Sequence, residues 1–134
     1  MKEVSRVGAY GIALFDRHIL LIKQVKGPLK DLLDLPGGGL EEGETPAAAL
    51  KREFSEEVAG QFDYFRHVQT LYHTHYHPTM IYHLEAHIFV VTGFAHLLAA
   101  KANGELPFQW YPFSQLSSLQ LTPVTQKALQ LDLI

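Results

Sequence analysis

The sequence predicts an α/β fold of the α+β type, in which helices cover a mixed β-sheet. Two observations support this prediction. Long apolar, β-rich runs are interspersed with helical segments, and two Thr-Pro pairs, Thr45-Pro46 and Thr122-Pro123, each mark the start of a helix. The composition predicts a single domain over residues 1–134, because 47% of the residues are apolar and only 19% are charged.

The beginning of the chain predicts a β-hairpin followed by a loop. Residues 4–15 and residues 19–25 are apolar, β-rich runs, and residues 16–18 between them predict a short turn. Residues 29–39 predict a loop. The loop ends in one proline and three glycines, residues 36–39, where glycine lets the backbone approach a ligand closely.

The clearest helix begins at Thr45, a good N-cap, with Pro46 at the first helical position. The residues that follow are strong helix formers, and the helix is expected to end near Gly60. Its apolar residues recur at helical spacing and form one stripe, made of Ala47, Leu50, Phe54 and Val58.

The rest of the chain predicts three more strands and a second helix. Residues 62–76 and 81–92 have the pattern of two long strands joined by a turn at Pro78-Thr79. The shorter elements follow in order: a strand at 108–113, a helical turn at 114–119, and a helix from Thr122 to about Leu131.

Charge and composition exclude several classes of partner. The 11 basic residues are scattered without a run or stripe, so no polymeric nucleic acid is expected as a partner. No apolar run approaches the roughly 20 residues of a membrane span, and the N-terminus lacks a signal-peptide core, so we expect a cytoplasmic protein without a membrane partner. The absence of cysteine excludes disulfides and thiolate metal sites.

The acidic residues are concentrated in one stretch. Six of the 14 lie within 17 residues: Glu41, Glu42, Glu44, Glu53, Glu56 and Glu57. At about 100° per residue, Glu53, Glu56 and Glu57 share one side of the predicted helix, beside its apolar stripe. Because like charges at this spacing repel each other, these glutamates form either a solvated helix face or a cation site, and hard oxygen ligands suit Mg²⁺ or Mn²⁺.

Residues 38–60 resemble the Nudix box, G-x5-E-x7-R-E-U-x-E-E-x-G-U, in which U is a bulky apolar residue. The resemblance covers 23 of the 134 residues. The seven matching positions are Gly38, Glu44, Arg52, Glu53, Phe54, Glu56 and Glu57. Two positions depart from the pattern, because Ala59 stands where the family has glycine and Gly60 where it has an apolar residue. We therefore expect the helix to run one residue further, with Gly60 in the left-handed terminal conformation.

The resemblance implies the Nudix fold, an α/β/α sandwich around a mixed β-sheet. It also implies hydrolysis of a nucleoside diphosphate linked to another moiety, by attack of water on a phosphorus. Glu53, Glu56 and Glu57, with the carbonyl of Gly38, would then hold Mg²⁺ or Mn²⁺. Such an ion neutralises charge on the phosphoryl oxygens and lowers the pKa of bound water.

The resemblance also implies roles for the catalytic residues. Glu56 or Glu57 would take the proton of the attacking water, and Arg52 would orient the site by pairing with Glu44 and Glu53. The alternative bases outside the box are Glu85 and Glu105.

Two other functions on the same fold stay open at this point: a nucleotide-binding or sensor module without catalysis, and an isomerase of a small diphosphate. The intact run from Arg52 to Glu57 favours the hydrolase. Its substrate is open among oxidised nucleoside triphosphates, ADP-ribose, dinucleoside polyphosphates and nucleotide sugars. Homodimers are frequent on this fold, so a homodimer is open as well.

Histidines form a second pattern, because five of the eight lie between residues 73 and 87. They fall into two alternating sets, each on one face of a predicted strand: His73, His75 and His77, and then His83, Glu85 and His87. Pairing of His77 with Met80 would put the two sets on opposite sides of the sheet, whereas pairing with Ile81 would bring them together.

Three interpretations of these histidines stay open: a second metal site, a pocket that contacts the base or phosphates of the substrate, and a polar sheet face. In the last case Tyr72, Tyr76 and Tyr82 are expected on the side that packs. His18, His67 and His96 follow no pattern and are expected at the surface.

Overall fold

Seven strands and three helical segments lie in the part of the chain that the computed structural model describes, residues 1–58, 62–93 and 108–130. They follow one another as β1 (Lys2–Phe15), β2 (His18–Lys23), β3 (Leu33–Asp34), β4 (Gly37–Gly39), α1 (Pro46–Val58), β5 (Tyr64–His77), β6 (Met80–Thr92), β7 (Phe108–Pro112), the 3-10 helix η2 (Phe113–Ser118) and α2 (Pro123–Leu129). Among these described helices, none is long and apolar enough to cross a membrane.

Strand β1 organises the sheet because it pairs with three other strands. It runs parallel to β6 from Lys2 to Ala13, and β5 continues the sheet beyond β6 in antiparallel pairing. On its other edge β1 pairs antiparallel with β4, and its last two residues form a hairpin with β2. Strand β2 in turn pairs with β3 and β7. The predicted mixed sheet is therefore confirmed.

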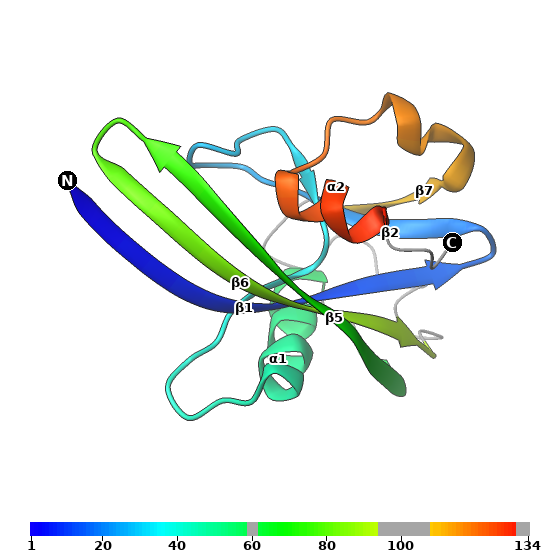
Figure 1. The fold of residues 1–134 in the computed structure, drawn as a ribbon. Coiled ribbons are helices and arrows are strands. Elements are labelled where there is room, and N and C mark those ends of the chain that lie inside the picture. Colours follow the sequence, from blue (N-terminus) through cyan, green and yellow to red (C-terminus); the bar gives the residue numbers. More distant parts are fainter. Residues whose placement is uncertain (59–61, 94–107, 131–134) are drawn as a thin grey trace.

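A helix covers each face of the sheet, so the predicted sandwich is confirmed too (Figure 1). On one face α1 buries Leu50 and Phe54 against strands β1 and β2. On the other face α2 buries Val124 and Ala128 against the opposite side of the same strands. Gly11 lies under α1, where a Cβ would come within 2.7 Å of the Phe54 ring, so the close approach of helix and sheet requires glycine there.

The β1–β2 turn and both helix starts form as predicted. Asp16 and Arg17 form the turn with positive φ angles of 48° and 59°, as a tight hairpin turn requires. Thr45 Oγ1 accepts a hydrogen bond from the Ala48 amide at 3.1 Å, and the Thr122 side chain caps α2. The predicted helix ends at Gly60 and Leu131 lie outside the described residues, as do Ala59, His96 and Glu105.

The prediction that residues 29–39 form only a loop was wrong. Two short strands, β3 and β4, interrupt it, because β3 pairs with the end of β2 and β4 pairs with Gly8–Tyr10 of β1. Their length of two and three residues is below what a sequence pattern can indicate. This pairing fixes the glycine run against the centre of the sheet.

The register of the β5–β6 hairpin separates the two histidine sets. His77 pairs with Met80, so His73, His75 and His77 lie on the α2 side of the sheet, and His83, Glu85 and His87 lie on the α1 side. Tyr82 packs on the α2 side, but Tyr72 and Tyr76 are 68% and 75% exposed, so their expected packing was wrong.

His67 is exposed, as expected, and it also contacts His87. A β-bulge between His67 and Gln69 shifts the alternation of β5, and His67 therefore shares a face with Phe89. His67 Nε2 lies 3.4 Å from His87 Nδ1, and His87 Nε2 lies 2.8 Å from Glu85 Oε2. The α1 side of this hairpin thus carries a hydrogen-bonded polar network.

Candidate active site

The glycine run of β4 lies directly against the sheet and the glutamate-bearing helix. Gly37 has a φ of +149°, and a Cβ there would come within 2.1 Å of the Ala9 carbonyl oxygen. At Gly38 a Cβ would lie 2.7 Å from the carboxyl carbon of Glu53. Only glycine can therefore bring this backbone so close to both β1 and the Glu53 carboxylate.

Glu57 fixes the glycine strand to α1. Its side chain is buried, and its Oε1 accepts a hydrogen bond of 2.7 Å from the Gly37 backbone amide. The apolar stripe of the helix explains this burial, because Phe54 and Val58, which flank Glu57 on the helix, are fully buried. A buried carboxylate is thus held at the edge of the core, where helical spacing predicts it.

Arg52 holds the other acidic side chains of the box together. Its guanidinium donates two hydrogen bonds to the Glu44 carboxylate, at 2.8 and 2.9 Å. Nη1 also contacts Glu53 Oε1 at 2.9 Å and Glu56 Oε2 at 3.2 Å, and Nη2 donates to the Gly39 carbonyl at 2.9 Å. Arg52 therefore ties the loop, its last acidic residue and the helix into one network, and its predicted pairing with Glu44 and Glu53 is present.

The ion pair with Arg52 makes the stability of the fold depend on the charge of Glu44. The hydrogen bond from Arg52, and then the backbone hydrogen bond at Glu41, lower the pKa of the Glu44 carboxyl below its ordinary value of 4.5. The stabilisation is therefore complete above pH 4.5 and is lost as the pH falls through the lowered value.

We expect Glu44→Gln to lower the free energy of unfolding at pH 7 and to have a much smaller effect near pH 3, because the wild-type carboxyl is then protonated. Denaturant unfolding of both proteins at the two pH values measures this difference. Glu42→Gln is the matched control, since Glu42 is exposed on the same loop. An equal effect of Glu44→Gln at both pH values would contradict the expected role of its charge.

The box residues are assembled, but their carboxylates do not surround one common point. Within residues 1–58, 62–93 and 108–130, no three His, Asp or Glu side chains are grouped so that they could hold a metal ion. Arg52 contacts the carboxylates of both Glu53 and Glu56, so an ion would share these ligands with the guanidinium. The donor set still fits a hard divalent ion, because it consists of carboxylate oxygens beside a glycine backbone.

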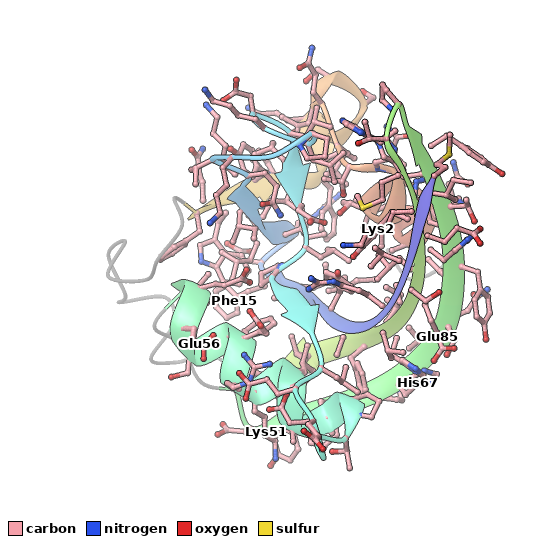
Figure 2. The ribbon with its side chains drawn as sticks, turned by 90° about the vertical axis from the view of Figure 1, so that its left-hand side faces the viewer. Lys2, Phe15, Lys51, Glu56, His67 and Glu85 are labelled. Carbon is pink, nitrogen blue, oxygen red and sulfur yellow. The ribbon has the colours of Figure 1, made fainter. Side chains whose placement is uncertain are left out.

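The alternative base Glu85 lies away from the box. Figure 2 shows Glu85 beside His67 on the outer strands, well separated from Glu56 on α1. Its carboxylate is engaged with His87, at 2.8 Å. Glu53 and Glu57 of α1, in contrast, both lie against the glycine strand.

A cavity of about 340 Å³ opens on the α2 side of the sheet. It is lined mainly by apolar and aromatic side chains, including Tyr10, Tyr82, Leu84, Leu29 and Val124. Tyr10 borders both the cavity and the glycine strand: it lines the cavity, and it pairs with Gly37, whose amide donates a hydrogen bond to Glu57. Burial, and then the charge of Asp34, raises the pKa of the Tyr10 hydroxyl. The cavity thus meets the glycine strand at Tyr10.

Sequence reasoning missed Asp34 at the floor of this cavity. Asp34 is buried, and its Oδ1 accepts hydrogen bonds from the Thr122 and Thr125 hydroxyls at 2.8 and 2.7 Å and from the Leu35 amide at 2.9 Å. Its Oδ2 accepts from Gln24 at 3.0 Å. The available signal was an aspartate inside the apolar run of residues 32–35, because a charged residue in such a run needs partners.

A mixed sheet between two helices, with a glycine strand fastened to a glutamate-bearing helix by arginine and glutamate, is the arrangement implied by the resemblance to the Nudix box. A model of the NUDIX domain matches residues 4–131 of the chain. The chain therefore belongs to the NUDIX domain family.

The chain is also similar to individual proteins of known name. It is 47% identical over 52 residues to an ADP-ribose pyrophosphatase of Methanocaldococcus jannaschii, a match that spans 39% of this chain and only 31% of that enzyme. Its fold resembles a MutT NUDIX hydrolase of Burkholderia pseudomallei, with a TM-score of 0.78, 24% identity, and coverage of 94% and 96% of the two chains. It also resembles the NUDIX domain of Shewanella oneidensis NrtR, solved with ADP ribose, with a TM-score of 0.70, 15% identity, and coverage of 97% and 86%.

Proposed function

We propose that this chain is a Mg²⁺-dependent hydrolase that cleaves the diphosphate of a nucleoside diphosphate derivative, acting in the cytoplasm. The observation that carries the proposal is the contact of the glycine strand with α1, where Glu57 holds the Gly37 amide and Gly38 lies against the Glu53 carboxylate. This contact brings the Glu53 carboxylate against the backbone of Gly38, and carboxylate oxygens beside a glycine backbone are ligands that suit a hard divalent ion.

In this proposal Glu53, Glu56 and Glu57, with the Gly38 carbonyl, hold Mg²⁺, and Mn²⁺ would serve the same ligands. When bound there, such an ion would supply positive charge against the phosphoryl oxygens and would lower the pKa of a water molecule. Glu56 or Glu57 then accepts the proton of the attacking water. Arg52 keeps Glu53 and Glu56 in place through its short contacts and does not itself need to touch the substrate.

The cavity beside the box supports a nucleoside as the non-reacting part of the substrate. Its volume of about 340 Å³ and its aromatic lining suit a planar base, and Tyr10, which lines it, pairs with Gly37 of the glycine strand. Two of the similar proteins are named for, or were solved with, ADP-ribose. We therefore propose ADP-ribose and related adenosine diphosphate derivatives as the first substrates to test.

The test is product release from ADP-ribose, a nucleotide sugar, a dinucleoside polyphosphate and an oxidised nucleoside triphosphate, each with Mg²⁺, with Mn²⁺, and with excess EDTA. We expect cleavage of at least one compound, its loss in EDTA, and its recovery when Mg²⁺ is restored. Binding without turnover for every compound would favour the nucleotide-binding module, and rearrangement without hydrolysis would favour the isomerase; either result overturns the proposal.

A further inference from the structure

Three histidines of strand β5 form one side of the cavity, which we call the histidine wall. His73, His75 and His77 alternate along β5, share the α2 side of the sheet, and all contribute to the lining. They lie opposite Leu84, Tyr82 and Met80 of β6, which also line the cavity. An apolar cavity suited to a base thus has one side made of polar rings.

Neighbouring hydrogen-bond donors determine which ring nitrogen carries the proton in two of these histidines, His73 and His77. The Lys127 ammonium lies 3.3 Å from His73 Nδ1, and because an ammonium only donates, Nδ1 is the acceptor. Likewise the Thr79 backbone amide lies 3.5 Å from His77 Nδ1 and only donates. In the neutral rings the proton is therefore on Nε2, so both side chains offer an N–H donor on their other side.

The charges around the cavity favour an anion at the same wall. Lys26 lines the cavity, and among the described residues it takes part in no ion pair within 4.0 Å. The acidic residue of the lining is Asp34, whose two oxygens already accept four hydrogen bonds from protein donors. The cavity therefore offers an anion the N–H donors of the histidines and the charge of Lys26. The Asp34 carboxylate in its lining already has four protein donors.

The histidine wall lies away from the reacting end of the cavity. Tyr10, the cavity residue that pairs with Gly37 of the glycine strand, pairs on its other side with Ile88 of β6, whereas His73 pairs with Leu84. Four residues of strand separate Ile88 from Leu84, which corresponds to roughly 13 Å. An anionic group at the wall is thus a different group from the diphosphate at the box.

We propose that the cavity recognises a second phosphate of the substrate, carried by the nucleoside at a position remote from the diphosphate, through His73, His75, His77 and Lys26. The proposal rests on the proposed function for the place of the reacting diphosphate. It narrows the substrate class from nucleoside diphosphate derivatives to those with an additional phosphate on the nucleoside ribose.

Binding of unreactive probes tests this inference separately from catalysis. We would measure the Kd of AMP, adenosine 2′,5′-bisphosphate and adenosine 3′,5′-bisphosphate by calorimetry, with and without Mg²⁺. We expect one of the two bisphosphates to bind at least about tenfold more tightly than AMP, because each charge-assisted hydrogen bond to phosphate adds affinity. Equal Kd values for AMP and both bisphosphates would overturn the proposal.

Matched variants show whether this wall is responsible. His75→Gln and Lys26→Met should each reduce the preference for the bisphosphate to about threefold or less. His83→Gln is the control on the opposite face of the same hairpin, and Lys30→Met is the control on the same loop as Lys26; both should keep the full preference. A preference that survives in His75→Gln and Lys26→Met would place the second phosphate elsewhere and overturn the proposal.

The two proposals fail in different ways. If a bisphosphate binds preferentially but no diphosphate compound is cleaved with Mg²⁺, the proposed function is wrong and the phosphate site stands. If ADP-ribose is cleaved but ADP-ribose 2′-phosphate has the same kcat/KM and the bisphosphates bind no better than AMP, the hydrolase stands and the phosphate site is wrong.

Discussion

The Glu57→Gln variant is expected to lose at least about a hundredfold in kcat with Mg²⁺ and a cleavable substrate, since a metal-binding or proton-accepting carboxylate contributes on this scale. The amide cannot accept a proton at neutral pH and is a weak ligand for a hard cation. Glu57 is buried and held against the glycine strand by its hydrogen bond with the Gly37 amide. Steady-state kinetics at saturating Mg²⁺ measure the loss.

The substitution is informative because the fold should tolerate it. The glutamine side chain of this variant keeps an oxygen that can accept the hydrogen bond of the Gly37 amide. Circular dichroism and thermal unfolding should therefore match the wild type closely. Ser55→Ala, on the exposed side of the same helix, is the control and should retain full activity. A folded Glu57→Gln variant with kcat within tenfold of the wild type would remove Glu57 from the catalytic site.

The second large effect is expected for Arg52→Met, which keeps the alkyl chain of the side chain and removes its charge. We expect the free energy of unfolding at pH 7 to fall by about 2–3 kcal/mol, because several charge-assisted hydrogen bonds disappear and partly buried carboxylates lose their partner. The guanidinium is about a fifth exposed, and we therefore place the loss below the range for fully buried pairs. Denaturant unfolding measures it.

A double-mutant cycle separates the contribution of the Arg52–Glu44 pair. Arg52→Met, Glu44→Gln and the double variant should show a coupling energy of about 1 kcal/mol or more, since the pair is bidentate. Lys51→Met is the control on the neighbouring exposed position, where the ammonium lies 4.9 Å from the Phe65 ring. A coupling near zero, with a loss equal to that of Lys51→Met, would contradict the central role of Arg52.

The box could be predicted from the sequence because its geometry is local. Helical spacing alone puts Glu53, Glu56 and Glu57 on one side of α1, and the same stretch of chain supplies Arg52 with its partner Glu44. The capping residue Thr45 and the apolar stripe then fix where the helix starts and which side it buries. The predicted helix and the predicted ion pair are therefore both present, whereas the burial of Glu57 emerges only from the structure.

The cavity could not be predicted in this way, because distant segments build it. Asp34 meets Thr122 and Thr125, which are 88 and 91 residues away, and no periodicity links such positions. The register of the histidine strands was open for a related reason. This register depends on the length of the turn between His77 and Met80 and on the β-bulge between His67 and Gln69. The turn length and the bulge leave no mark in the alternation of residue types along the strands.

The turn at Pro78-Thr79 therefore has a consequence beyond joining two strands. With two residues between them, His77 and Met80 face each other, and the cavity receives histidines from β5 and apolar or aromatic side chains from β6. A three-residue turn that included Met80 would instead pair His77 with Ile81 and His75 with His83. The set of side chains that lines the cavity thus depends in part on spacing, because the length of this turn determines which face of each strand looks into the cavity.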